Sequence, residues 1–180
     1  ALPALLLALE EPDIAANIIV GDFAPFDRPP YMRENLQALK LAAGSEQARG
    51  QLNGNRDEIL QNVFHRDMPA DARFELSPLF QDDMRRAWQH GEVTSGDAFA
   101  YYYANFTRDE RYFEAHADRL KTPIKVVWGE LDPYIGKAMG VEFAQRVHAP
   151  LNVLPDVGHF PHLQSPARTI AEIRASFDES

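Results

Sequence analysis

The residues best suited to chemistry are an acid and a histidine in the last third of the chain. Asp132 follows the apolar run 124–128 in a GELDP segment, and His159 follows the run 151–154 in a PDVGHF segment. A carboxylate that accepts an imidazole N–H fixes the tautomer of the ring, and the other ring nitrogen can then act as a base. The two residues are therefore candidates for the acid and base of a nucleophile–His–acid triad.

Both candidates depend on neighbouring parallel strands, whose carboxyl ends meet at one edge of a sheet. Continuous apolar runs bounded by turn residues predict strands buried on both faces. The predicted strands are 17–20, 124–128 and 151–154. Helical periodicity and start signals predict flanking helices at 1–9, 136–147 and 167–177. This alternation predicts an α/β fold with a parallel sheet.

The middle of the chain, about 30–119, is expected to contain helices only. Helices are predicted at 31–41, 56–64, 77–90, 94–106 and 109–119, with a polar segment at 44–54 and a connection at 68–75. Such a block between two strands of a sheet is expected to lie over the carboxyl ends of the strands. The predicted organisation is a core segment 1–29, a helical cap 30–120 and a second core segment 121–180.

This pattern resembles the C-terminal part of the α/β-hydrolase superfamily. In that family the acid follows a late strand in a Gly-x-x-Asp turn, the histidine sits in a Gly-His loop, and the nucleophile precedes both. Residues 121–177 match, from PIKVVWG to the Ser-Pro before the last helix, and 17–25 look like the strand after the nucleophile's helix. The resemblance implies a capped hydrolase of the epoxide hydrolase, haloalkane dehalogenase or esterase kind.

The family's nucleophile elbow, Gly-x-Ser-x-Gly or its Asp counterpart, is missing from these 180 residues. The serines that stand beside start signals are interpreted as helix caps; they are Ser45, Ser77, Ser95 and Ser165. The N-terminal half of the fold is therefore expected as a partner, on a separate chain or on a segment outside this sequence. This segment alone is expected to be inactive.

The resemblance implies hydrolysis of a small, largely apolar ester, epoxide or alkyl halide, with no cofactor. A rival position for the acid is Asp22, because some relatives carry the acid after that earlier strand. Cap tyrosines of epoxide hydrolases donate hydrogen bonds to the epoxide oxygen. A similar role in substrate binding is conceivable for Tyr101, Tyr102 or Tyr103, with Trp88, Phe160 and His162 as further lining residues. No third ligand has suitable spacing to make His162 part of a metal site.

Composition limits the alternatives. The formal charge of −9 argues against a broad surface for nucleic acid or anionic membranes, and the lack of cysteine excludes a thiol nucleophile. No signal peptide or membrane span is evident, so a cytoplasmic location is expected. Two other interpretations stay open: a non-catalytic ligand-binding protein on the same fold, and a small doubly wound domain complete in itself.

Overall fold

The structure is a computed structural model that describes residues 1–42, 45–66, 68–70 and 73–178. The chain divides into two compact units. Unit 1 combines Ala1–Glu34 with the part of the chain from Thr107 on, and unit 2 is Asn35–Phe106. The two units are described one at a time.

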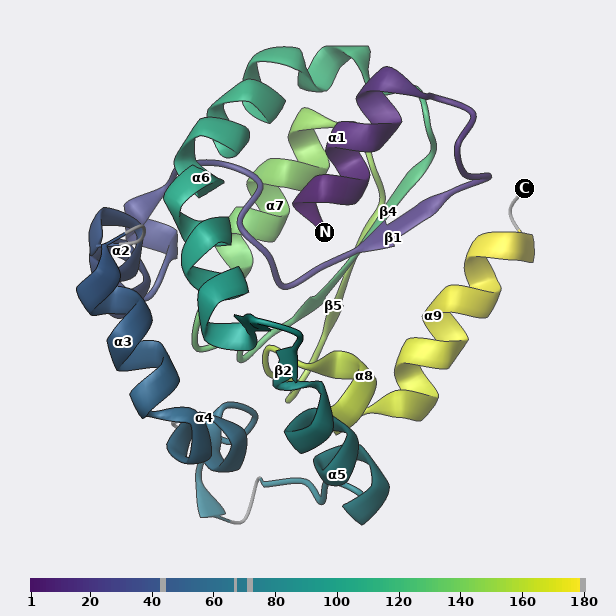
Figure 1. Cartoon of the computed structure of the whole chain (residues 1–180). Helices are drawn as coiled ribbons and strands as arrows, with labels where there is room; N and C mark the ends of the chain where they lie inside the picture. The colour runs from purple at the N-terminus through teal and green to yellow at the C-terminus, as the bar shows by residue number, and fades with distance from the viewer. Residues whose placement is uncertain (43–44, 67, 71–72, 179–180) are drawn as a thin grey trace. The chain divides into compact units, whose positions relative to one another are not determined.

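A three-stranded parallel sheet forms the centre of unit 1 (Figure 1). Its strands are β1 (Ile18–Val20), β4 (Ile124–Gly129) and β5 (Leu151–Leu154), in the order β1-β4-β5. Val20 is paired with Val126, and Gly129 is paired with Leu154. The three strands predicted from apolar runs and the predicted fold class are confirmed. The register places the last residues of β4 and β5 side by side, where the candidate acid and histidine follow.

The helices of unit 1 flank this sheet. They are α1 (Leu2–Glu10), α7 (Lys137–Arg146), α8 (Pro161–Gln164), α9 (Pro166–Asp178), the C-terminal part of α6 (Ser95–His116), and the 3-10 turns Pro29–Tyr31 and Ala117–Arg119. Side chains alternate between the two faces of a strand. In β4, Trp128 packs against Gly140 of α7, whereas Val127 shares a cavity wall with Ile173 of α9. Helices α7 and α9 therefore cover opposite faces of the sheet.

An aromatic cluster fills the core on the α7 side. Trp128, Phe143, Phe26 and Phe113 are all buried. The ring centroids of Phe26 and Phe113 are 6.2 Å apart, and those of Phe113 and Phe143 are 6.1 Å apart. Fully burying one such side chain stabilises the fold by about 1.5–3 kcal/mol. The cluster therefore anchors the C-terminal part of α6 to the α/β core.

Unit 2 is built mainly from helices. It contains α2 (Glu34–Ala42), α3 (Glu46–Gly54), α4 (Arg56–Asn62), α5 (Pro78–Ala87), the start of α6, and a hairpin of β2 (Gln89–His90) and β3 (Val93–Thr94). The hydroxyl of Ser45 accepts the N–H of Ala48, and that of Ser77 accepts the N–H of Phe80. Both serines are N-caps, as expected. Asp71 and Ala72, inside the predicted connection 68–75, lie outside the described residues.

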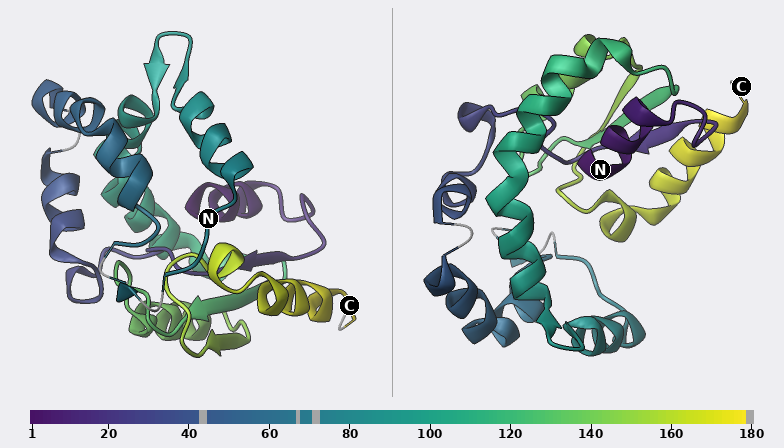
Figure 2. Two further views of the ribbon diagram at one scale, coloured as in Figure 1. Left: turned by 90° about the horizontal axis from the view of Figure 1, so that it is seen from below. Right: turned by 45° about the horizontal axis from the view of Figure 1, so that its top comes forward.

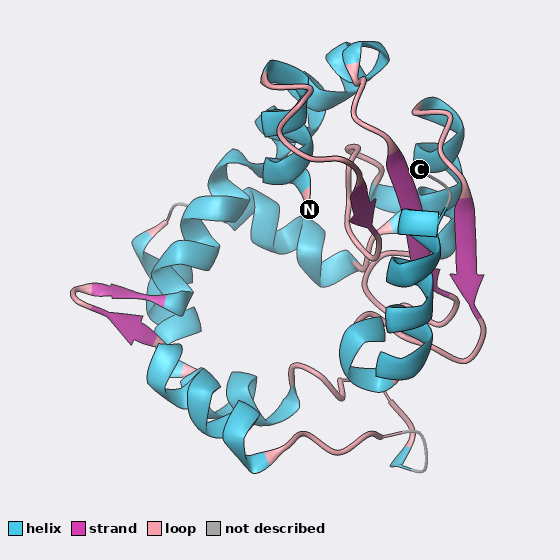
Figure 3. Ribbon diagram, turned by 90° about the vertical axis from the view of Figure 1, so that its right-hand side faces the viewer, coloured by secondary structure: helices cyan, strands magenta, loops and turns pink. Residues whose placement is uncertain are grey.

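Three expectations for the middle of the chain are wrong. It is not purely helical, because Gly91, at φ 59°, turns the chain into the β2–β3 hairpin (Figures 2 and 3). Helix α6 runs unbroken through the predicted gap after 106, since no glycine or proline interrupts it there. The cap of α6 is Thr94 rather than Ser95: the Thr94 hydroxyl accepts the Asp97 N–H, and the Asp97 carboxylate accepts the Thr94 N–H.

Candidate active site

Backbone hydrogen bonds join the loops that follow β4 and β5. The Glu130 N–H donates to the Leu154 carbonyl over 3.0 Å, and the Leu131 N–H donates to the Val157 carbonyl over 2.8 Å. Gly129 allows this approach, because a Cβ on it would lie 2.7 Å from the Val157 oxygen and closer still to that of Gly158. The last residue of β4 must therefore be glycine if the two loops are to meet.

Asp132 and His159 form a hydrogen bond at this junction. The distance between His159 Nδ1 and Asp132 Oδ2 is 2.8 Å. The Asp132 side chain is fully buried, while 24% of the His159 side chain is exposed. The other oxygen of Asp132, Oδ1, accepts the backbone N–H groups of Tyr134 at 2.8 Å and Ile135 at 3.0 Å. The buried carboxylate is thus held on both oxygens, as a buried charge requires.

These contacts determine which nitrogen of His159 is available. An ionised carboxylate only accepts hydrogen bonds, so the bond to Asp132 places a proton on Nδ1 and leaves the lone pair on Nε2. The ring is packed between Tyr134 and Phe160, whose centroids are 4.9 and 4.8 Å away. Among the described residues, none forms a hydrogen bond with Nε2. A buried acid and a partly exposed base, oriented in this way, can perform general base chemistry.

The loop that carries His159 is held from helix α8. The Gln164 side-chain oxygen accepts the Gly158 N–H over 2.6 Å, and its amide nitrogen donates to the Asp156 carbonyl over 3.2 Å. Asp156 itself has φ 61°. Gln164 therefore closes the turn in front of the histidine and limits how far the ring can shift.

Asp22 follows β1 and reaches the same junction from the other side of β4. The backbone of Asp22 has a φ of 52°, and its side-chain Oδ1 accepts the Gly129 N–H over 2.8 Å. The preceding Gly21 packs directly on the backbone of Val127, where a Cβ would lie 2.7 Å from the carbonyl carbon. Burial is the main cause that raises the pKa of Asp22 to about 8. The hydrogen bond from Gly129 lowers this pKa, and the negative charge of Asp132 raises it.

Comparison with known proteins identifies the family of the chain. A family model described as "Alpha/beta hydrolase family" matches residues 1–173. The chain belongs to the alpha/beta hydrolase family. No protein among the curated sequences matches the chain.

Solved structures of other hydrolase-fold proteins have a similar fold. An alpha/beta hydrolase fold protein from Burkholderia ambifaria aligns with a TM-score of 0.65 at 17% identity, over 96% of this chain and 61% of its own. The enol-lactonase from Burkholderia xenovorans LB400 aligns with a TM-score of 0.64 at 19% identity, over 99% of this chain and 62% of its own. A thermophilic esterase from Thermogutta terrifontis aligns with a TM-score of 0.58 at 19% identity, over 99% of this chain and 61% of its own. The chain thus spans about three fifths of the length of these proteins.

Of the two acid positions considered for this hydrolase-family chain, only Asp132 is hydrogen-bonded to His159. Asp22 instead accepts the Gly129 N–H at the end of β4. Phe160 packs edge-on against His159, and His162 follows it with a ring centroid 6.3 Å from that of Phe160. Partial desolvation of the His162 ring lowers its pKa, and the charge of His159 lowers it further. The substrate-binding roles of Phe160 and His162 stay predictions.

The four aromatic candidates of the middle segment belong to unit 2. Tyr101 is 74% exposed and Tyr102 is 38% exposed, whereas Tyr103 and Trp88 are buried in unit 2. Tyr103 packs against Phe99, Tyr102 and Phe106. These ring contacts make Tyr103 part of the packing of unit 2, and the use of any of the four in substrate binding stays a prediction.

Several positioning residues were not singled out from the sequence. The sequence predicts Gly129 as the end of a strand and the first residue of the Gly-x-x-Asp turn, but it does not predict its close packing or the contacts of Gln164 and Tyr134. The pattern that could predict the role of Gln164 is the PHLQ segment after His159 and Phe160, where Pro161 starts the short helix α8. Within the described residues, no cluster of three metal-binding side chains is present, and no helix is long and apolar enough to cross a membrane.

Proposed function

We propose that this chain supplies the acid and the histidine of a hydrolase that uses a nucleophile–His–acid triad. The carrying observation is the 2.8 Å bond between the buried Asp132 and the partly exposed His159, which leaves Nε2 without a partner among the described residues. Asp132 orients the ring and stabilises its charged form, and His159 is the base. The rings of Tyr134 and Phe160 beside the base favour a small, largely apolar substrate.

The nucleophile lies outside this chain in this proposal, and its identity sets the reaction. With a serine, Nε2 takes the hydroxyl proton while the oxygen attacks an ester carbonyl, and the imidazolium then protonates the leaving alcohol. With an aspartate, the carboxylate opens an epoxide or displaces a halide, and Nε2 removes a proton from the water that hydrolyses the ester intermediate. Both routes need the base to be held as His159 is held here.

The free edge of β1 is the proposed place for the strand that carries the nucleophile. Among the described strands, β1 pairs only with β4. Apolar side chains beside the sheet in unit 1 are exposed: Leu7 by 45%, Ile14 by 49%, Ile170 by 47% and Ile173 by 40%. The aligned structures are longer than this chain, and the preceding half of the fold that we propose would pair with β1 and bury these side chains.

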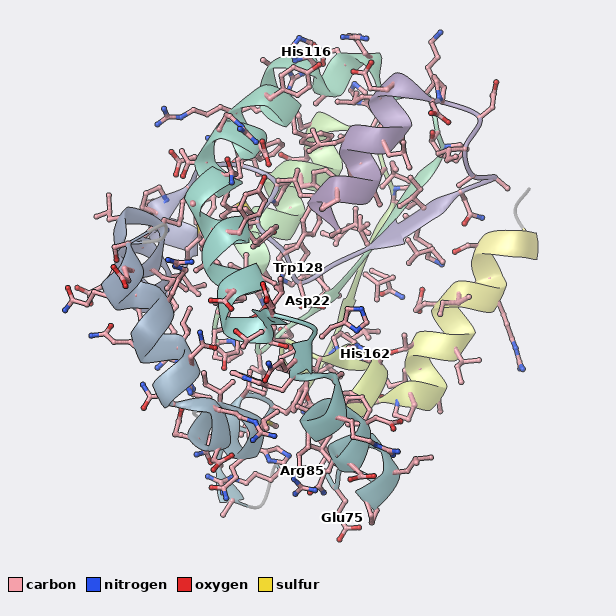
Figure 4. All side chains as sticks on the ribbon, viewed as in Figure 1. Asp22, Glu75, Arg85, His116, Trp128 and His162 are labelled. Carbon is pink, nitrogen blue, oxygen red and sulfur yellow. The ribbon has the colours of Figure 1, made fainter. Side chains whose placement is uncertain are left out.

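A substrate panel tests this function. The polypeptide that contains this chain and the preceding half is assayed with p-nitrophenyl esters, epoxides and haloalkanes. His159→Ala is expected to lower kcat by roughly 10³–10⁴-fold for the substrate that is turned over. The control is His116→Ala, since Figure 4 shows His116 well away from Asp22 and His162. Equal activity of the wild type and His159→Ala would reject the assignment.

A further inference from the structure

The two backbone N–H groups that hold Asp132 belong to residues that are anchored by other parts of unit 1. Asp132 Oδ1 accepts the N–H groups of Tyr134 and Ile135 at 2.8 and 3.0 Å. The carbonyl of Tyr134 accepts the backbone N–H of Arg33 over 2.8 Å. The carbonyl of Ile135 accepts the indole Nε1–H of Trp128 over 3.2 Å. Both donor residues are therefore fixed at the N–H and at the C=O.

The anchor on Ile135 differs from the anchor on Tyr134, because it comes from a side chain. A backbone N–H is available at every residue except proline, whereas an indole N–H is specific to tryptophan. The indole nitrogen is a donor with no acceptor function, so its bond to the Ile135 carbonyl has a defined direction. The amino-acid type at position 128 therefore determines whether this anchor exists.

The indole ring of Trp128 is held rigidly in the core of unit 1. The residue is fully buried and is paired with Val153 of β5. A Cβ on Gly140 would lie 2.5 Å from the indole, so the backbone of α7 packs directly on the ring. The ring centroid of Phe23 lies 6.2 Å from that of Trp128. A donor on a ring that is fixed by strand, helix and loop gives the Ile135 carbonyl a well-defined position.

We propose that Trp128 is a positioning residue for the acid of the proposed triad. Its indole N–H fixes Ile135 at the carbonyl, and the N–H of Ile135 then holds Asp132 Oδ1. Oδ2 is thereby directed at His159 Nδ1. This inference rests on the proposed function, because it treats Asp132 as the acid. Trp128 acts through Ile135 and is not itself a catalytic residue.

The competing explanation is that the indole N–H serves the stability of the fold alone. A buried indole N–H requires an acceptor, and any carbonyl within reach would satisfy it. The acceptor here belongs to Ile135, one of the two residues whose N–H groups hold Asp132. Misplacing a catalytic group by about 1 Å can cost roughly a hundredfold in rate. The two explanations therefore predict different values of kcat when the N–H is removed and the shape of the ring is kept.

The test replaces the indole N–H by sulfur. Benzothienylalanine is placed at position 128 of the polypeptide that contains this chain and the proposed preceding half. This protein is expected to lose about tenfold in kcat with KM little changed, because Asp132 is less well held. Trp128→Phe, which also lacks the N–H, is expected to lose at least as much.

Thr122→Val is the matched control for this test. Thr122 is buried in unit 1, and its hydroxyl donates to the Pro12 carbonyl over 2.7 Å. The substitution therefore also removes one hydrogen bond from a buried side chain to a backbone carbonyl and keeps the shape of the side chain. Because this bond has no link to the loop that carries Asp132, Thr122→Val should keep the wild-type kcat.

A proton resonance separates this inference from the proposed function. The His159 Nδ1 proton, which is bonded to Asp132, is observed by ¹H NMR without any substrate. Benzothienylalanine at position 128 is expected to move this signal and to speed its exchange with water, whereas Thr122→Val should leave it unchanged. If the signal behaves so but His159→Ala is fully active, the proposed function fails and the anchoring of Asp132 by Trp128 stands. An unchanged signal, or a wild-type kcat in an enzyme that depends on His159, overturns the inference.

Discussion

At the scale of single residues, the candidate site depends on how one buried carboxylate is stabilised. Asp132 has no exposed side-chain surface, and a buried charge is tolerated only when it is fully hydrogen-bonded. Its partners are two backbone N–H groups and His159. The same contacts that make its burial possible orient the histidine, so stability and the proposed chemistry depend on the same few bonds.

The raised pKa of Asp22 makes the stability of the fold depend on pH. In the unfolded chain the carboxyl ionises near its ordinary pKa of 3.8, whereas the folded protein keeps the proton until about pH 8. Between these values the folded state binds more protons than the unfolded state. The free energy of unfolding therefore falls as the pH rises through this window, by at most about 1.4 kcal/mol per pH unit from this group.

Asp22→Asn is expected to remove that contribution. From pH 5 to pH 8, the free energy of unfolding should fall less in Asp22→Asn than in the wild type, by at least about 1 kcal/mol. Urea unfolding at the two pH values measures this difference, with Asp13→Asn as the matched control. Parallel pH dependences in the wild type and Asp22→Asn would show that Asp22 is ionised in the folded protein.

At the scale of elements, the close approach of strand ends positions the site. Gly21 follows β1 and packs against the backbone of β4, and Gly129 ends β4 against the loop that carries His159. Both contacts are between main chains, so no rotamer change could make room for a side chain. The ends of the three strands are therefore fixed relative to one another by the backbone itself.

Gly129→Ala tests this packing. The added methyl group would push on the Val157 and Gly158 carbonyls and displace the His159 loop, at a cost of about 1–3 kcal/mol in the free energy of unfolding. The control is Gly50→Ala in α3. A Cβ on Gly50 would meet nothing within 4 Å beyond its own stretch of helix backbone, so alanine should raise the free energy of unfolding by about 0.5–1 kcal/mol. Chemical denaturation measures both variants. Equal effects of the two substitutions would contradict the account.

The sequence predicts the elements with regular signals and misses those set by contacts between distant residues. Apolar runs between turn residues predict β1, β4 and β5, and Ser77-Pro78 predicts the start of α5. The order of the acid and histidine segments predicts that the two side chains meet. The hydrogen bond from the Gly129 N–H to Asp22 is not predicted, because it depends on the order of strands in the sheet.

The middle of the chain shows where local patterns fail. Asp109 resembles a helix start and so predicts two helices where the structure has one of 22 residues, because acidic residues are also ordinary on exposed helix surfaces. The two-residue strands of the hairpin carry too few residues for any periodicity, and only Gly91 indicates the turn. Boundaries of a cap at 30 and 120 stay a prediction.

At the scale of the whole molecule, the chain is a member of the alpha/beta hydrolase family that spans about three fifths of the length of the aligned structures. The loops that carry Asp132 and His159, the sheet of β1, β4 and β5, and a mainly helical unit are present in it. The free edge of β1 and the exposed apolar side chains beside it are the surfaces on which the proposed preceding half would pack. Hydrolysis by a polypeptide that contains this chain and the proposed preceding half is therefore the measurement that tests the residues, the elements and the whole molecule together.

The most direct test is a double-mutant cycle on the proposed triad in the complete polypeptide. Values of kcat/KM are measured for the wild type, Asp132→Asn, His159→Ala and the double variant, with circular dichroism to establish folding. Each single change is expected to lower kcat/KM by roughly 10³–10⁴-fold, and the double variant should be no worse than His159→Ala, because members of a triad act as one unit. Losses that multiply in the double variant, or a His159→Ala protein as active as the wild type, would contradict the account.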